Sequence, residues 1–168
     1  MQALYDGIVG SGFRIASGQS VGRQDNPFPD GSLKMEDGHF RERGIDLGAL
    51  VPGLFWGTIN LKLGRELALA RADYMARDVD WTETLTGEAR IAPETFSFIR
   101  CCFAYPLGGG AGSTGYYPGL IYYPHPETKP KTNAHHFDVL EVLTSELPGL
   151  AHGTPASLVC RADAFRPR

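Results

Sequence analysis

Short apolar runs separated by glycine and proline constrain the fold of this chain more than any other feature. The 168 residues include 21 glycines and 12 prolines, and these are spread along the chain instead of being gathered in one linker. Both residues favour turns and interrupt helices, so the pattern is typical of short strands joined by long loops. The length suits one hydrophobic core. We therefore predict a mainly β, single-domain fold over residues 1–168.

Six segments have the composition or the period-two alternation of strands. In chain order they are ALYDGIVG, GTINLKL, TFSFIRCCFAY, GLIYYP, FDVLEVL and ASLVCRA, and EARIA is a weaker seventh. Strands of this number and length, with long loops between them, predict a compact six-stranded β-barrel.

Helical signals are fewer than strand signals. HFRERGIDLGAL, from His39, is expected to form a short helix that is broken at Gly44 or ends at Gly48. RELALARADYMARD, over 65–78, contains good helix formers and is predicted as a second helix. The barrel should therefore carry one or two short helices.

Two long polar segments, 10–38 and 106–119, show almost no periodic apolar signal. Loops of this length are usually either functional or without fixed structure. Their aromatic and apolar residues favour ordered covers over a cavity for at least part of each.

Charge and hydropathy argue against a nucleic-acid-binding, a membrane-spanning or a secreted protein. A net charge of −3 with scattered signs provides no basic face for nucleic acid. No apolar run approaches the roughly 18 residues that span a membrane. The first residues lack the basic start and unbroken apolar stretch of a secretion signal, so a cytoplasmic protein is expected.

The three cysteines are predicted to be small core residues. Cys101 and Cys102 are adjacent in a strand-like run, where they would point to opposite faces, and Cys160 lies in a similar run. This spacing forms neither an easy disulfide between the adjacent pair nor a metal clip.

The stretch FWGTINLKL interrupts a strand with polar residues. Thr58 and Asn60 lie two residues apart and should project from the same face, next to an apolar face that begins at Ile59. Their oxygens could hold a water, a hard cation or a phosphate-bound metal. The alternative is an ordinary strand with one solvent-facing side.

A glycine-serine loop follows the first strand. GSGFRIASGQS contains Gly10, Ser11, Gly12 and Gly18, and such residues let backbone amides and hydroxyls approach a phosphate. It matches neither common phosphate-loop motif, so an ordinary loop remains the alternative.

The stretch TNAHHFDVLEVL concentrates polar groups at the start of a late strand. His135 and His136 should diverge if that strand begins near Phe137, which makes a histidine metal site the weaker interpretation. Glu141 interrupts an apolar run and points either to water or to a ligand. The chain contains no recognisable activated nucleophile.

Three of these fragments, GIVGSG, GTINLKL and HHFDVLEVL, occur in an order that resembles the archaeal CTP-dependent riboflavin kinases, whose fold is a six-stranded cradle-loop barrel. The resemblance implies that Thr58 and Asn60 hold the Mg²⁺ that bridges the nucleotide phosphates. It also implies that the loop after the first strand cradles the nucleotide triphosphate, through Gly10, Ser11, Gly12 and Gly18.

The resemblance further implies a flavin contact at Glu141, which we take as the catalytic residue. Further flavin or substrate contacts are expected at Thr132 or Asn133 and at His135. The family's nucleotide-contacting Ala-Pro-x-x-Leu-Arg segment is replaced over 144–149, where no arginine occurs, so the cytidine preference does not carry over.

The expected function is a magnesium- and nucleotide-dependent kinase that transfers a phosphoryl group to a small acceptor such as riboflavin. The alternatives are a non-catalytic barrel that binds a flavin, a nucleotide or another small ligand, and an interaction protein that uses the tyrosine pairs 116–117 and 122–123. No nucleic-acid or membrane partner is expected.

Overall fold

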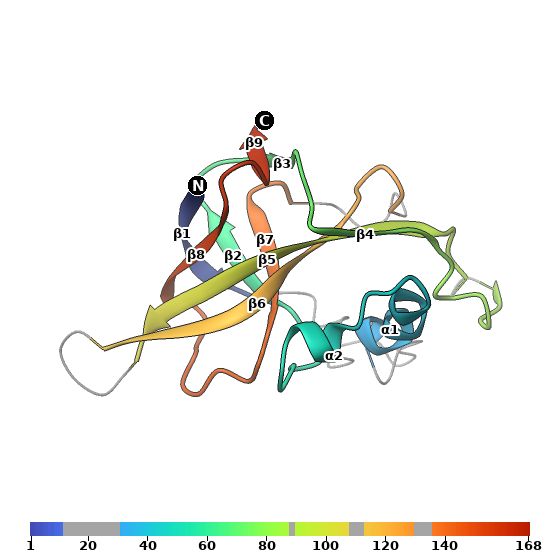
Figure 1. Ribbon diagram of the computed structural model, residues 1–168, viewed down its shortest axis with the longest axis horizontal. Helices are drawn as coiled ribbons and strands as arrows, with labels where there is room; N and C mark the ends of the chain where they lie inside the picture. The colour runs from blue at the N-terminus through green and yellow to red at the C-terminus, as the bar shows by residue number, and fades with distance from the viewer. Residues whose placement is uncertain (12–30, 88–89, 108–112, 130–135) are drawn as a thin grey trace.

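The computed structural model describes residues 1–11, 31–87, 90–107, 113–129 and 136–168 (Figure 1). Its strands are β1 (Gln2–Gly10), β2 (Ile59–Leu63), β3 (Leu67–Leu69), β4 (Tyr74–Val79), β5 (Glu94–Pro106), β6 (Thr114–Pro124), β7 (Val139–Thr144), β8 (Pro155–Arg161) and β9 (Phe165–Pro167). Two short helices, α1 (Ser32–Glu42) and α2 (Leu47–Leu50), lie between β1 and β2.

The main sheet is antiparallel and has the order β4-β5-β6-β7-β2-β1-β8 in the described part of the chain. An additional pairing of β5 with β8 closes six of these strands into a barrel. The predicted mainly β, six-stranded barrel with two short helices is thus confirmed. Strands β3 and β9 form a separate two-stranded sheet.

The long strand β5 has two different neighbours on the same edge. Its first half pairs with β4, whereas its second half, from Cys101 to Ala104, pairs with β8 and closes the barrel. The sheet formed by β4, β5 and β6 therefore extends beyond the barrel, as Figure 1 shows. This extension provides the surface on which the helices pack.

Period-two alternation along the strands separates two hydrophobic cores. One face of each barrel strand fills the interior. The barrel core contains Tyr5, Val9, Leu61, Leu63, Ile99, Phe103, Ile121, Leu140, Val142, Leu158 and Cys160. The opposite face of β5, β6 and β7 meets the helices in a second core with Phe40, Phe96, Phe98, Leu120, Tyr122 and Leu143.

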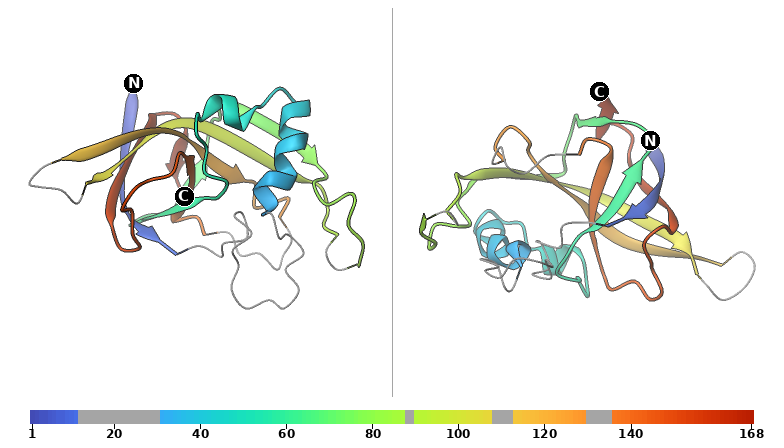
Figure 2. Two further views of the ribbon diagram at one scale, coloured as in Figure 1. Left: turned by 90° about the horizontal axis from the view of Figure 1, so that it is seen from below. Right: turned by 180° about the vertical axis from the view of Figure 1, so that it is seen from behind.

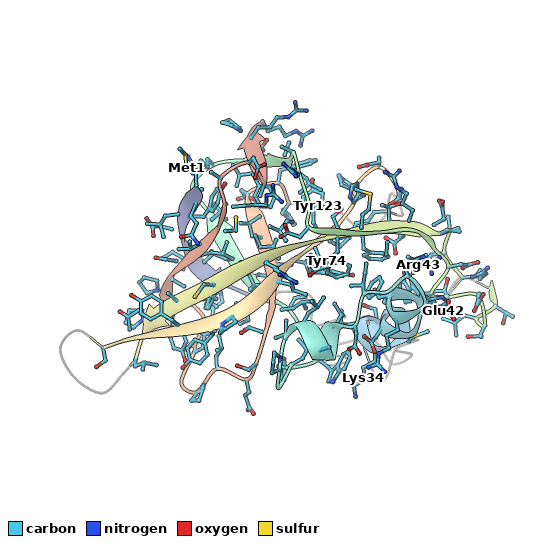
Figure 3. The ribbon with its side chains drawn as sticks, in the orientation of Figure 1. Met1, Lys34, Glu42, Arg43, Tyr74 and Tyr123 are labelled. Atoms are coloured by element: carbon cyan, nitrogen blue, oxygen red, sulfur yellow. The ribbon has the colours of Figure 1, made fainter. Side chains whose placement is uncertain are left out.

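Helix α1 is anchored on the outer face of the sheet by Phe40. This side chain is fully buried, and its ring meets Phe96 and Phe98 edge-on at centroid distances of 5.2 and 5.0 Å. Arg43, directly after the helix, donates hydrogen bonds of 3.1 and 3.2 Å to the carbonyls of Arg77 and Asp78 near the end of β4 (Figure 3). Both helices therefore lie on one side of the sheet extension (Figure 2).

The predicted break in the first helical segment is confirmed, although its start was not predicted. Helix α1 ends just before Gly44, which has a positive φ of 75°, and α2 begins after Asp46, whose side chain accepts a hydrogen bond from the Ala49 amide. The helix starts at Ser32, inside a segment that was expected to be a loop.

The predicted helix over 65–78 is wrong. These residues form β3 and nearly all of β4, where Tyr74 and Ala76 pair with Phe98 and Phe96. Good helix formers are overridden here by pairing with the edge of β5, since tertiary contacts outweigh local propensity.

Two further boundaries differ from the prediction. In EARIA, residues 88–89 lie outside the described residues and the rest is not a strand, because Arg90 forms an ion pair with Asp80 and the Ile91 amide bonds the Thr82 hydroxyl. Strand β6 begins at Thr114, within the expected loop over 106–119. No helix of the described segments is long and apolar enough to cross a membrane.

Candidate functional site

Four residues lie side by side across the outer face of the barrel, and we call them the site row. Gly10 of β1 pairs with Asn60 of β2, Asn60 pairs with Glu141 of β7, and Glu141 pairs with Tyr122 of β6. Laterally paired residues project to the same face of a sheet. The fragments GTINLKL and HHFDVLEVL, which suggested a ligand site, are therefore adjacent in the sheet, and the end of β1 lies next to them.

The burial of their neighbours fixes which way these side chains point. Leu61 has no exposed surface and lies in the barrel core, so Asn60 before it faces outward. Likewise, Leu140 and Val142 are in the barrel core and turn Glu141 outward. A shift of one residue in either strand would place a polar group inside the barrel, which makes the register strongly specified.

Thr58 joins the site row from the segment that precedes β2. Its hydroxyl lies close enough to the Glu141 carboxyl group to favour the ionised form of that group. Burial raises the pKa of Glu141, while the positive charge of Lys129 and the Thr58 hydrogen bond lower it in part. The polar residues of GTINLKL therefore face an acid from a strand about eighty residues away in the sequence.

Helix α1 adds a second carboxyl group above the site row. Glu36 is only 2% exposed, and its Oε2 accepts a hydrogen bond of 2.8 Å from the Tyr122 hydroxyl. Burial is the main cause that raises the pKa of Glu36 to about 8, and the negative charges of Glu94 and Glu141 add to it. Burial and the Glu36 charge likewise raise the pKa of Tyr122.

A third carboxyl group comes from the start of β5. Glu94 is 4% exposed and its Oε2 accepts a hydrogen bond of 2.8 Å from the Trp81 indole nitrogen. Burial raises the pKa of Glu94, and Lys129 lowers it in part. Lys129 thus acts on both Glu94 and Glu141, so the site combines three acids with one nearby cation.

Sequence reasoning missed Glu36 and Glu94. A usable signal for Glu36 exists, because Leu33, Glu36, Asp37 and Phe40 are all buried and follow the i, i+3, i+4, i+7 spacing of a helix face. Two of these four positions are acids, so a search for apolar residues alone does not detect this helix face.

The oxygens gathered here are chemically suited to Mg²⁺. A threonine hydroxyl and an asparagine carbonyl are hard donors, and Mg²⁺ is commonly held by a few protein oxygens together with substrate phosphates and water. No group of three or more histidine, cysteine or acidic side chains in the described segments could hold a metal. Thr58 and Asn60 therefore fit a metal that is coordinated partly by a bound phosphate better than a metal that is coordinated by protein side chains alone.

The structure does not describe five of the residues that were singled out from the sequence. Gly12, Gly18, Thr132, Asn133 and His135 lie outside the described residues.

Ser11, His136 and His125 are described and do not belong to the site row. Ser11 is exposed directly after β1, and His136 is exposed before β7. The ring of His125 lies 2.9 Å from both the Ser97 hydroxyl and a Glu127 carboxylate oxygen.

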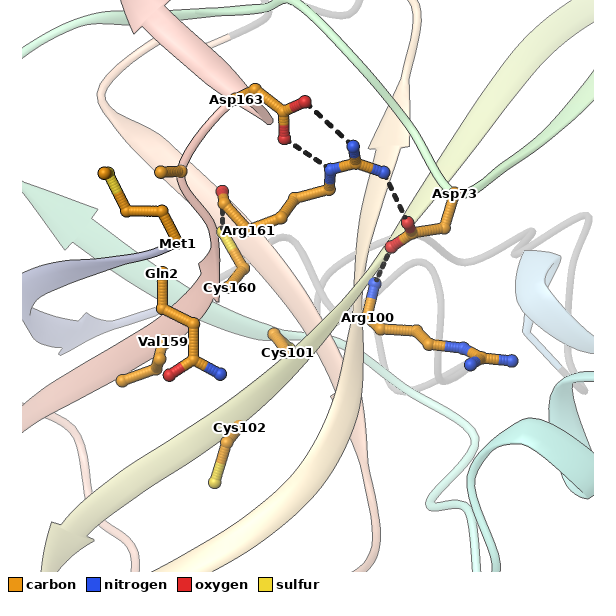
Figure 4. Close-up of a pocket in the computed structure, with 11 residues that line it drawn as sticks. Met1, Gln2, Asp73, Arg100, Cys101, Cys102, Val159, Cys160, Arg161 and Asp163 are labelled. Atoms are coloured by element: carbon orange, nitrogen blue, oxygen red, sulfur yellow. Dashed lines mark hydrogen bonds and ion pairs between the residues drawn. The ribbon is translucent and has the colours of Figure 1, made fainter.

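A separate cleft lies where β5 and β8 close the barrel (Figure 4). Arg161 in this cleft bonds Asp73 at 2.9 Å and Asp163 at 2.8 Å, so its charge is already compensated. Cys101 and Cys160 are paired in register here, and burial raises the pKa of both thiols, that of Cys160 to about 11. Cys160 is a buried core residue as predicted, whereas Cys101 and Cys102 are only partly buried. The raised pKa values of Cys101 and Cys160 suit packing better than nucleophilic chemistry.

Comparison of the chain with protein-family models, with curated proteins and with solved structures gives no match in any of the three.

Proposed function

We propose that this protein is a magnesium- and nucleotide-dependent kinase of a small molecule, of the riboflavin-kinase type. The observation that carries the proposal is the meeting of Thr58, Asn60 and Glu141 on one outward face of a closed six-stranded barrel. These are the positions to which the resemblance assigns the metal and the flavin contact.

Each residue would have a distinct role in phosphoryl transfer. Thr58 and Asn60 would hold the cation through their side-chain oxygens. When bound, that cation offsets the negative charge that develops on the transferred phosphoryl group. Glu141 would accept the proton of the attacking hydroxyl, and a pKa raised by burial makes its carboxylate a stronger base than a solvated one.

Gly10 supports a ligand at the end of the site row. Among the described residues, a Cβ atom placed on this glycine would meet only the Asn60 carbonyl oxygen, at an ordinary contact distance of 3.7 Å. Gly10 also does not have a positive φ. Since neither packing against the described residues nor backbone geometry requires glycine here, close approach of a phosphate is a reason for its presence.

A non-catalytic ligand-binding barrel is the second candidate. It is favoured by the replacement of the family's arginine-containing segment over 144–149. The interaction-protein alternative needs exposed tyrosines in both pairs. Tyr122 and Tyr123 are buried, and of the four tyrosines Tyr116 is the most exposed, at 71%. This alternative therefore loses support.

Isothermal titration with MgCTP and MgATP tests the site. We expect Thr58→Ala and Asn60→Ala to weaken binding at least tenfold, the size of one lost polar contact to a charged group. Thr114→Ala is the matched control, because Thr114 is exposed at the far end of β6. Unchanged binding in both site variants, or binding that does not need magnesium, would refute the metal assignment.

Titration with riboflavin identifies the acceptor. Riboflavin is expected to bind the wild-type protein and to bind Glu141→Gln less tightly. If riboflavin and nucleotide both bind but no phosphorylated product forms, the binding-module alternative replaces the kinase.

A further inference from the structure

Helix α1 places a buried carboxyl group against the site row. Glu36 accepts the Tyr122 hydroxyl at 2.8 Å, and Tyr122 lies beside Glu141 in the register of β6 and β7. Glu36 and Tyr122 are 2% and 6% exposed, so both side chains are shielded from bulk solvent. The contact joins α1, β6 and β7 at one point.

The helix is docked by contacts that do not involve this carboxyl group. Phe40 lies one turn further along α1 and packs on Phe96 and Phe98. Arg43 ties the end of the helix to β4. We therefore expect the helix to stay in place when the charge of Glu36 is changed.

The groups that face Glu36 favour its neutral form. Among the described residues, the charged groups acting on it are Glu94 from β5 and Glu141 from β7, and both are acids. Hydrogen bonds from Tyr122 on β6 and from Ser32 on α1 oppose them in part. With burial as the largest cause, the pKa of Glu36 rises to about 8, and the group holds its proton at neutral pH.

We propose that Glu36 controls nucleotide binding at the site row: its protonated carboxyl group leaves the row accessible to phosphates, and its ionised form adds a buried negative charge that repels them. This inference rests on the proposed function, because it assumes that the row receives a nucleotide. Glu36 acts through charge and through Tyr122, and is a positioning residue that does not itself contact the substrate.

Binding of MgATP and MgCTP measured between pH 6.5 and 9.5 tests this inference. In the wild-type protein, affinity is expected to fall with a midpoint near pH 8 and by on the order of tenfold, the effect of one added like charge. Glu36→Gln is expected to keep its affinity through this range. Glu42→Gln is the matched control on the same helix, since the Glu42 side chain is 74% exposed, and it should behave as the wild type.

Tyr122→Phe adds a test that a purely structural role would not pass. The Tyr122 hydrogen bond lowers the pKa of Glu36, so its loss should move the midpoint of the affinity change to higher pH. The carbon-13 signal of the Glu36 carboxyl, assigned by its loss in Glu36→Gln, should titrate at the same midpoint as the affinity.

The outcomes separate this inference from the proposed function. If neither nucleotide binds at any pH, both are overturned. If nucleotide binds but its affinity falls equally in the wild type and in Glu36→Gln, or the Glu36 carboxyl titrates below pH 6, only the role of Glu36 is overturned.

Discussion

Replacement of Glu36 by glutamine should remove the pH dependence that this one residue gives to folding stability. The pKa of Glu36 is about 8 in the folded protein against its usual value of 4.5. The folded state therefore binds the proton more tightly than the unfolded state. This contribution to stability is complete below pH 4.5, falls as the pH rises, and is lost above pH 8.

The size of the effect follows from the same two values. A difference from 4.5 to about 8 corresponds to about 5 kcal/mol in total, at 1.36 kcal/mol for each tenfold change in proton affinity. Between pH 5 and pH 9 the part lost by the wild type is about 4 kcal/mol. Glu36→Gln has no such titration, so its free energy of unfolding relative to the wild type should rise by that amount.

Urea unfolding followed by tryptophan fluorescence at pH 5, 6, 7, 8 and 9 measures this difference. Other titrating groups occur in both proteins and largely cancel in the comparison. Glu42→Gln should show a constant difference from the wild type, because Glu42 is exposed on the same helix. A difference between Glu36→Gln and the wild type that stays constant within about 0.5 kcal/mol from pH 5 to pH 9 would refute the reasoning.

Three further predictions concern packing and thiol chemistry. Phe40→Ala should lower the free energy of unfolding by about 3–5 kcal/mol, because it empties a fully buried ring position; a loss below about 1 kcal/mol in urea unfolding would contradict the anchoring role of this ring. Gly119→Ala should cost about 1–3 kcal/mol, since its Cβ would lie 2.4 Å from a β7 carbonyl oxygen, whereas Gly64→Ala has open space and should cost less than 1 kcal/mol; equal losses would show that the backbone adjusts. Cys160, whose pKa is about 11, should react with iodoacetamide at pH 7.5 far more slowly in the folded protein than in urea, as measured by mass spectrometry; equal rates would show that this thiol is not protected.

The barrel strands could be predicted because each has an apolar face of period two. In β2 and β7 the same alternation also gives the direction of Asn60 and Glu141, once the barrel interior is known. What the sequence could not provide is that these two residues are lateral partners, because strand pairing depends on contacts between distant segments.

The errors have local causes. The segment over 65–78 has the composition of a helix, yet the free edge of β5 pairs with it as β4. Helix α1 was hidden because its buried face includes Glu36 and Asp37 alongside Leu33 and Phe40. A search for apolar periodicity does not detect acidic residues on a buried helix face. In this chain the buried acid Glu36 lies next to the candidate site.

Turnover of riboflavin by the wild-type protein and by Glu141→Gln tests the central claim most directly. With magnesium and CTP or ATP, the wild type should form riboflavin 5'-phosphate and nucleoside diphosphate in equal amounts, separated by chromatography. Glu141→Gln should lower kcat by at least about a hundredfold, the usual effect of removing a general base, without weakening nucleotide binding, because the substitution removes a negative charge beside the phosphates. Equal turnover by both proteins would contradict the role of Glu141, and no product from a wild type that binds both ligands would contradict the kinase itself.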